Sequence, residues 1–371
     1  MSTTKICYVI SHIDKAMAFE WIAKSLKTKF QLTFILLNPS SSNLEDFLVQ
    51  QGLEVKRITY RGKQNFLSAL IKAFFYFLAS KPHVVHAHLF DAQLIGLTAA
   101  WLAGVKKRIY TRHNSNYHHV YHPRGVKFDI WSNRMATQII SISQSTDHTL
   151  VQLEHVAPSK IVRIPHGFEL KAFEASSAES VNKLCKKWHI DQTKPVIGVI
   201  ARHIEWKGIQ FIVPAFRKFL DEYPTATLVL ANASGPYHET LVEISKTIPS
   251  GNVVLLPFEE DIASLYALFD IYVHTPVDSL AEAFGQTYVE ALAAGVPSIF
   301  TLSGVAAEFI VHERNALVVK FKNTEEIYQS LMRLWKDEEL RMLLSKNGRQ
   351  DVFSQFGAEP MLDSLSKLYD Y

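Results

Sequence analysis

Short buried-looking runs alternate with segments of helical length along almost the whole chain, and this alternation is what most constrains the fold. Lys5–Ile10, Thr33–Leu37 and Val84–Ala87 are apolar runs of strand length. Helical segments with regularly spaced apolar residues follow such runs. Asp14 is expected to cap the first of them, and another helix is expected over Ser145–Val156. Strands that alternate with helices predict a parallel sheet covered by helices on both faces.

A polar stretch from Phe168 to Lys194 interrupts the alternation, which restarts with the apolar run Val196–Ala201. We therefore expect an α/β protein with two doubly wound, Rossmann-like domains, residues 1–168 and 169–354, and a cleft between them. The final helix, residues 355–371, is expected to cross back to the N-terminal domain. Clefts between domains are favoured ligand sites.

The composition is that of an ordinary globular protein and excludes several classes. The net charge of only +3 argues against a dedicated nucleic-acid binder. Cys7 and Cys185 lie far apart and fit neither a metal-ligand spacing nor a disulfide framework. The chain enters its first strand without a signal-peptide pattern, so we expect a cytoplasmic location.

The segment Phe66–Ala79 is apolar on nearly all sides and is accompanied by Arg61, Lys63, Lys72 and Lys81. It is too short to span a bilayer. One interpretation is a helix that packs on the sheet, and the other is peripheral contact with the inner face of a membrane.

The segment from Asp278 to Thr301 contains two glutamates, Glu282 and Glu290, with Gly285 between them. Ligands of open α/β sheets bind where strand ends meet helix starts. In one continuous helix the two glutamates would point about 80° apart. One continuous helix is therefore a poor way to bring both side chains to one ligand, and we expect Glu282 in the loop before the helix and Glu290 inside the helix. The alternative is an exposed helix with two surface glutamates.

Arg202 and Lys207 follow the first strand of the second domain. A guanidinium offers a planar fork of donors and an ammonium a point charge, and together they suit a diphosphate. The alternative is a solvated loop with two cations.

Several landmarks occur together in one order along the chain. The second half contains Glu-x7-Glu, Ala201-Arg202-His203 followed by Lys207-Gly208, and Ser303-Gly304 followed by Glu308. The first half contains His86-Ala87-His88, Thr111-Arg112-His113, Ser141-Ile142-Ser143-Gln144 and Ile164-Pro165-His166-Gly167. This order resembles that of the retaining glycosyltransferases of family 4 (group 1), which have the GT-B fold.

The resemblance implies an enzyme that moves a sugar from a nucleotide-diphosphate donor, UDP- or GDP-linked, to a hydroxyl of a glycan or lipid-linked acceptor. The anomeric configuration would be retained, with neither a metal nor another cofactor. By the same resemblance, Arg202 and Lys207 would stabilise the leaving diphosphate, and His113 would line the sugar side.

Further roles in donor binding follow from the resemblance. Glu282 would contact the donor sugar and Glu290 the ribose. Phe258 would frame the base. Backbone N–H groups at a helix N-terminus would face the phosphates, contributed by Phe284, Gly285, Gln286 and Thr287.

The histidines of the first half have several interpretations. His86 and His88 point to one face of a strand, and a metal site there would lack an evident third ligand. His118, His119 and His122 fit no zinc pattern, and we expect them on a mobile loop on the acceptor side.

One departure from the family pattern leaves other functions open. The first loop, Ser11–Glu20, has no glycine where the family usually has a pair. The alternatives are a nucleotide-sugar epimerase or hydrolase on the same fold, and a catalytically silent partner subunit.

Overall fold

The computed structural model describes residues 3–174 and 176–370. It divides into two compact units: unit 1 comprises residues up to Phe168 together with those from Ala358 onward, and unit 2 comprises Glu169–Gly357.

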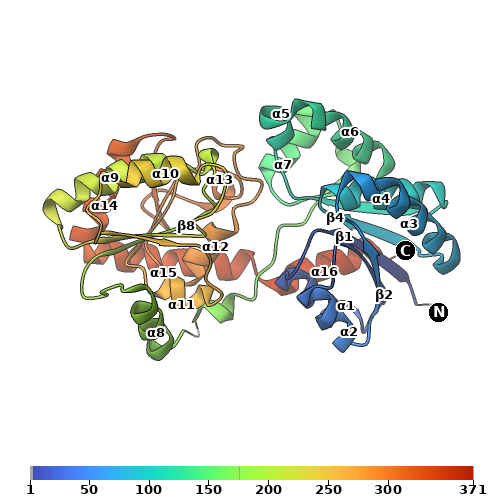
Figure 1. The fold of residues 1–371 in the computed structure, drawn as a ribbon, viewed down its shortest axis with the longest axis horizontal. Helices are drawn as coiled ribbons and strands as arrows, with labels where there is room; N and C mark the ends of the chain where they lie inside the picture. The colour runs from blue at the N-terminus through green and yellow to red at the C-terminus, as the bar shows by residue number, and fades with distance from the viewer. Residues whose placement is uncertain (1–2, 175, 371) are drawn as a thin grey trace. The chain divides into compact units, whose positions relative to one another are not determined.

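Figure 1 shows unit 1 as a sheet with helices packed around it. Its strands are parallel and have the order β3-β2-β1-β4-β5-β6-β7. The strands are β1 (Lys5–Ser11), β2 (Gln31–Asn38), β3 (Glu54–Thr59), β4 (Val84–His88), β5 (Lys107–Arg112), β6 (Gln138–Ser141) and β7 (Ile161–Arg163). The α-helices are α1 (Met17–Leu26), α2 (Asn43–Gln50), α3 (Phe66–Ser80), α4 (Phe90–Leu102), α5 (Tyr117–Tyr121), α6 (Val126–Met135), α7 (Gln144–His148) and α16 (Ala358–Tyr369).

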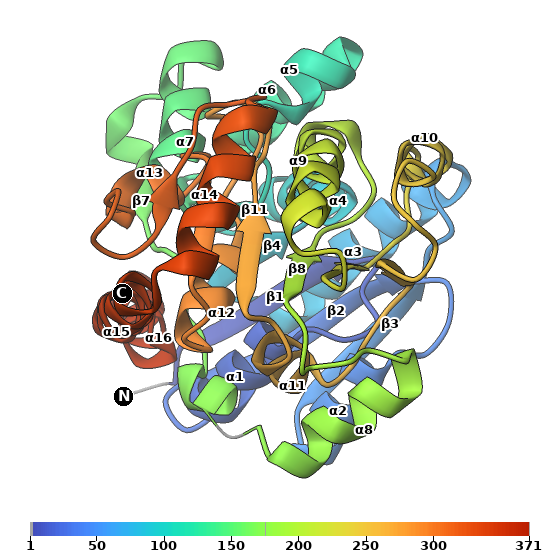
Figure 2. The same cartoon turned by 90° about the vertical axis from the view of Figure 1, so that its left-hand side faces the viewer.

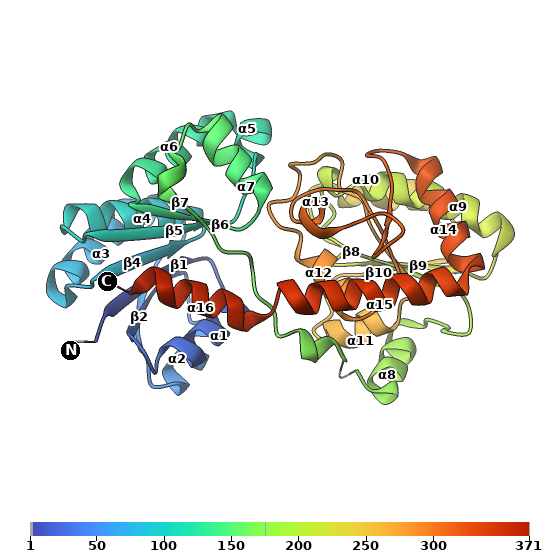
Figure 3. The same ribbon diagram turned by 180° about the vertical axis from the view of Figure 1, so that it is seen from behind.

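Helices cover both faces of this sheet. One buried cluster joins α3 and α4 to the sheet through small, aliphatic and aromatic side chains such as Ala69, Ile95 and Phe77. A second cluster joins α1, α2 and α16 to the opposite face. The C-terminal helix α16 therefore belongs to unit 1 (Figure 3). Within this unit the Tyr369 hydroxyl lies 2.6 Å from that of Tyr8.

Unit 2 repeats the design with a parallel sheet in the order β10-β9-β8-β11-β12-β13. The strands are β8 (Val196–Ile200), β9 (Thr227–Ala231), β10 (Val253–Leu256), β11 (Ile271–His274), β12 (Ser298–Phe300) and β13 (Leu317–Val318). The α-helices are α8 (Ala178–Trp188), α9 (Ile209–Glu222), α10 (His238–Ser245), α11 (Ile262–Ala267), α12 (Gln286–Ala293), α13 (Ala306–Phe309), α14 (Thr324–Lys336) and α15 (Glu338–Gln355).

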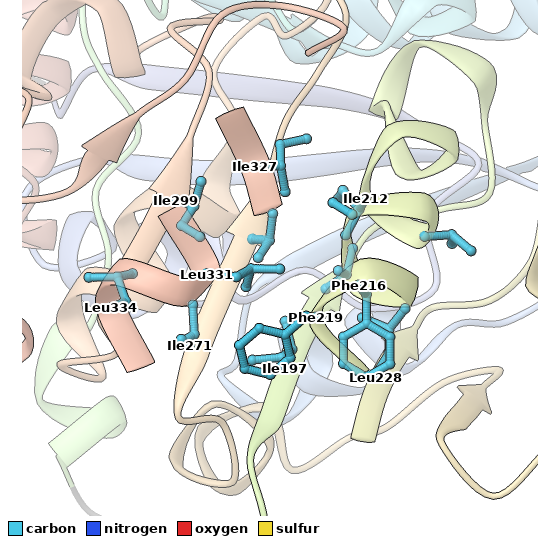
Figure 4. Packing of buried hydrophobic residues seen from close by; sticks show 14 of the residues in the cluster. Ile197, Ile212, Phe216, Phe219, Leu228, Ile271, Ile299, Ile327, Leu331 and Leu334 are labelled. Atoms are coloured by element: carbon cyan, nitrogen blue, oxygen red, sulfur yellow. The ribbon is translucent and has the colours of Figure 1, made fainter. Parts of the chain in front are cut away.

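The core of unit 2 lies between its sheet and two helices, α9 and α14, that flank β8 and β11 (Figure 2). Strand residues such as Ile197 and Ile271 meet Phe216 of α9 and Leu331 of α14 (Figure 4). Burial of these apolar side chains fixes the sheet and therefore the loops at its edge. The two doubly wound parallel sheets confirm the predicted fold class.

The alternation predicted most strands to within two residues, but several local expectations were wrong. Asp14 does not cap α1, because its carboxylate accepts hydrogen bonds from the backbone and side chain of Asn43. The helix expected over Ser145–Val156 is split into α7 and a wider turn at Thr149–Leu153. The segment expected as a mobile loop with His118 and His119 contains α5.

Candidate functional site

The loop from Thr275 to Gly285, between β11 and α12, meets side chains from distant parts of unit 2. Glu282 lies in this loop, between β11 and α12, as expected. Its Oε1 accepts hydrogen bonds from Nζ of Lys207 at 2.5 Å and lies 3.0 Å from Nε2 of His274. The carboxylate is 9% exposed, so the charges meet where water screens them little.

Ionisation of Glu282 is set by this pair. Burial alone would raise the pKa of Glu282, but the Lys207 ammonium and the hydrogen bond from His274 outweigh it and lower the pKa to about 2. Burial also lowers the pKa of His274, so its ring is neutral at physiological pH and donates an N–H. The site therefore holds one carboxylate and one ammonium ion.

Two glycines make this arrangement sterically attainable. Gly208 follows Lys207 with φ of 76°, and a Cβ there would lie 1.8 Å from the Thr275 carbonyl oxygen. Gly304 has φ of 61°, and a Cβ there would lie 2.8 Å from Cβ of Glu282. Both positions combine left-handed backbone with close approach, which only glycine permits.

The segment that begins with Ser303-Gly304 is hydrogen-bonded to the loop that carries Glu282. The Ser303 hydroxyl accepts the backbone N–H of Glu282 at 3.0 Å, and the Phe284 carbonyl accepts the N–H of Val305 at 2.9 Å. Neither this support nor the contribution of His274 was predicted. The position of His274 as the last residue of β11, at the carboxyl edge of the sheet, was the available signal.

Glu290 lies inside α12 as expected and faces a different partner. The Tyr266 hydroxyl donates a hydrogen bond to its Oε2 at 3.0 Å. Burial raises the pKa of Glu290 to about 7, and the Tyr266 hydrogen bond opposes this rise only in part. The structure therefore separates a permanently charged Glu282 from a Glu290 that titrates near neutral pH.

The other predicted residues of unit 2 have mixed surroundings. Arg202 is exposed just after β8, and no described residue forms an ion pair with it. Phe258 is 67% exposed after β10. The Phe284 side chain is a core residue that packs edge-on against Phe356. Only its backbone can face a ligand.

The N-terminus of α12 is built by Gly285, whose φ of 85° makes it a left-handed cap. Gln286 is exposed and Thr287 half-buried in the first turn. The first N–H groups of a helix have no partner within the helix and carry partial positive charge. This turn directly follows the Glu282 loop.

A histidine cluster of unit 1 surrounds the predicted His113. His113 follows β5, and its Nε2 lies 3.1 Å from Nδ1 of His88. Its ring stacks on that of His166, with centroids 5.5 Å apart. Burial lowers the pKa of His113 to about 3, so the ring is neutral.

Two other histidines of this unit, His86 and His118, also have protein partners. His86 is hydrogen-bonded to Tyr369 and Thr111, at 2.5 and 2.9 Å. His118 is bonded to the buried Asp129 at 2.6 Å, which holds α5 against α6. In the part of the chain that the structure describes, no group of three His, Cys, Asp or Glu side chains is arranged to hold a metal ion.

The glycine-free first loop has a specific conformation. His12 takes a left-handed conformation with φ of 51°, and its ring lies 3.0 Å from the Asp91 carboxylate. Asn38 holds the next residue through two hydrogen bonds with the Ile13 backbone. A histidine therefore occupies a backbone conformation that glycine adopts more readily.

Two family models match this chain, one in each half. A family model described as Glycosyl transferases group 1 matches residues 180–351, and one described as Glycosyltransferase Family 4 matches residues 22–172. The chain belongs to the family 4 (group 1) glycosyltransferases. Like the structures noted below, it has the GT-B fold, with a Rossmann-like sheet in each unit.

Individual relatives are distant. N-acetyl-alpha-D-glucosaminyl L-malate synthase of Bacillus anthracis is 25% identical over 64% of this chain and 61% of its own length. An Escherichia coli UDP-Gal:alpha-D-GlcNAc-diphosphoundecaprenol alpha-1,3-galactosyltransferase is 23% identical over 82% of this chain and 79% of its own length. Alpha-monoglucosyldiacylglycerol synthase of Acholeplasma laidlawii is 28% identical over 59% of this chain, and the match spans 54% of the relative.

Among solved structures, Anabaena Alr3699/HepE in complex with UDP-glucose superposes with a TM-score of 0.84 at 19% identity. The match covers 98% of this chain and 99% of that one. The glycosyltransferase from Rickettsia africae gives a TM-score of 0.81 at 18% identity, covering 100% and 98%. These similarities establish the fold.

Proposed function

We propose that this chain transfers a sugar from a nucleotide-diphosphate donor to a hydroxyl of a glycan or lipid-linked acceptor, with retention of the anomeric configuration. The observation that carries the proposal is the buried Lys207–Glu282 ion pair in the loop that leads into α12. Family membership and the UDP-glucose complex of a protein with the same fold support it.

Each donor group has a counterpart in unit 2. Glu282, charged at every physiological pH, accepts hydrogen bonds from hydroxyl groups of the donor sugar. Glu290 accepts hydrogen bonds from the hydroxyl groups of the ribose. Lys207, Arg202 and the backbone N–H groups of Gly285, Gln286 and Thr287 meet the charge that develops on the departing diphosphate. Phe258 offers an exposed ring for the base.

The proposed step needs no covalent intermediate. The bond between the anomeric carbon and the phosphate oxygen breaks, and its electron pair stays with the diphosphate. The acceptor oxygen forms the new bond on the same face of the sugar. The acceptor proton passes to the phosphate oxygen that leaves. Glu282 is already engaged by Lys207 and His274, which suits a binding role rather than that of a nucleophile.

Unit 1 is proposed to serve the acceptor side, with His113 donating to or positioning a sugar hydroxyl. A lipid-linked acceptor would bring the protein to a membrane as a peripheral partner. No helix in the described ranges is both long enough and apolar enough to cross a bilayer. We propose UDP rather than GDP as the first nucleotide to test, because UDP-glucose occupies the similar structure.

The test is a panel of nucleotide sugars incubated with the protein, first alone and then with polyprenyl-diphosphate-linked and soluble glycan acceptors. The proposal expects acceptor-dependent release of the nucleoside diphosphate and a product with retained configuration by NMR. Epimerised or freed sugar without an acceptor would indicate an epimerase or hydrolase. Absence of binding to every nucleotide sugar would indicate a silent subunit.

Glu290 makes donor binding depend on pH. With a pKa of about 7 in the free protein, its carboxyl group loses the charge that ribose hydroxyls require as the pH falls. The diphosphate of UDP-glucose does not titrate in this range. Affinity for UDP-glucose should therefore increase with increasing pH, by up to about tenfold per pH unit below about pH 7, and should level off above it.

Two variants isolate this effect in calorimetric titrations. Glu290→Gln should bind more weakly and without pH dependence. Tyr266→Phe removes the hydrogen bond that lowers the pKa and should move the midpoint to higher pH. An unchanged profile in Glu290→Gln would show that another group titrates.

A further inference from the structure

The outer side of α3 carries large apolar side chains that the unit does not bury. Leu67, Ile71, Phe75 and Leu78 are all exposed, Leu67 by 67% and Phe75 by 61%. Their spacing places them along one side of the helix. The inner side packs in the core through residues such as Phe77. We call these four exposed residues the α3 stripe.

The apolar surface continues on the neighbouring helices. α3 packs against α4 and α4 against α6, on the same face of the sheet of unit 1 (Figures 1 and 3). Trp101 lies in the last turn of α4, and Phe128 and Trp131 lie on α6, all more than 40% exposed. The Trp131 indole N–H donates to Thr98 of α4 at 3.0 Å, so the ring bridges the two helices.

This part of the chain is strongly basic although the whole chain is nearly neutral. Between Val55 and Phe128 the sequence has twelve lysines and arginines, of which only Arg112 is buried, and a single acidic residue, Asp91, which pairs with His12. Exposed cations accompany the apolar residues, with Lys63 before α3, Lys72 on it and Lys127 on α6.

We infer that the outer face of α3, α4 and α6 binds an anionic lipid membrane, with α3 lying in the plane of the interface. Tryptophan, phenylalanine and leucine together with lysine match the layered chemistry of the headgroup and acyl boundary. A second copy of this chain is a poorer occupant, because a symmetric contact would place two basic faces together. A nucleic acid would leave the α3 stripe without an apolar partner.

The inference deepens the proposed function and rests on it for its purpose, since a membrane-bound enzyme would meet a lipid-linked hydroxyl at the surface. Binding itself depends only on the outer face. A failure of membrane binding is therefore distinguishable from a failure of the proposed function, which is tested by the binding of nucleotide sugars in the absence of vesicles.

The experiment is sedimentation of the full chain with vesicles of phosphatidylcholine, with and without phosphatidylglycerol. We expect binding to the anionic vesicles that weakens as salt increases. Leu67→Gln with Phe75→Gln should lower the affinity about tenfold or more. Lys63→Gln with Lys72→Gln should lower it about fivefold for each cation removed.

The matched control is Met342→Gln with Leu343→Gln, two exposed apolar residues of α15. It should bind vesicles as the unmodified chain does. Thermal unfolding and UDP-glucose titration of each variant should be unchanged, since all six substituted positions are on the surface. The inference is supported if the α3 variant loses vesicle binding while its thermal unfolding and its UDP-glucose titration are unchanged.

Three results would overturn it. The unmodified chain could ignore phosphatidylglycerol vesicles, or the α3 variant could bind them equally well. The third is a dimer in solution that Leu67→Gln with Phe75→Gln converts to a monomer, which would assign the face to a second copy.

Discussion

Glu282→Gln is expected to reduce sugar transfer by about a thousandfold while leaving the protein folded, on the scale of removing one preorganised electrostatic contact. The amide keeps the size of the side chain but loses the charge that holds the Lys207 ammonium. Sugar hydroxyls then meet a weaker acceptor, and Lys207 is no longer fixed toward the diphosphate. Arg202→Ala should also abolish most turnover by removing the second cation.

The measurement is initial-rate transfer with the donor found in the panel, together with circular dichroism of each variant. Glu205→Gln is the matched control, because Glu205 is an exposed carboxylate just before Lys207 in the same turn. It should retain normal turnover. Near-normal rates in both Glu282→Gln and Arg202→Ala would refute the site.

Gly208→Ala is expected to destabilise unit 2 by about 3 kcal/mol or more and to remove activity as well. A Cβ at Gly208 would lie 1.8 Å from the Thr275 carbonyl oxygen, a backbone atom that cannot move aside without displacing the loop after β11. The same displacement would separate Lys207 from Glu282.

Gly104→Ala separates backbone strain from the clash. Gly104 has φ of 75°, against 76° at Gly208, but a Cβ there meets open space. Gly104→Ala should therefore cost only about 1 kcal/mol, the penalty for a left-handed side chain. The comparison uses the thermal unfolding midpoint of each variant. Equal losses in the two variants would contradict the close packing of Gly208 on Thr275.

Sequence patterns predicted the strands of this fold because a sheet that is buried on both faces requires strands that are apolar throughout. Strand residues such as Ile197 and Ile271 belong to runs that are apolar throughout, as a sheet covered on both faces requires. The angle between Glu282 and Glu290 on one helix likewise predicted that they separate into loop and helix. That prediction combined helix geometry with the expectation that both glutamates face one ligand, and the positions in loop and helix agree with the structure.

Contacts between loops were not predictable in the same way. Lys207 and Glu282 meet because β8 and β11 are neighbours in the sheet, and periodicity along the chain does not encode strand order. His274 and Ser303 enter the site for the same reason. Asp14 was wrongly expected to cap a helix, because a more distant partner, Asn43, competes for its carboxylate.

The most direct test of the central claim is a calorimetric titration of the unmodified chain, Glu282→Gln and Glu290→Gln with the same nucleotide sugars. Unit 2 should bind one nucleotide sugar per chain, and each variant should bind it at least about tenfold more weakly. Binding of no nucleotide sugar, or equal binding by all three proteins, would contradict the account.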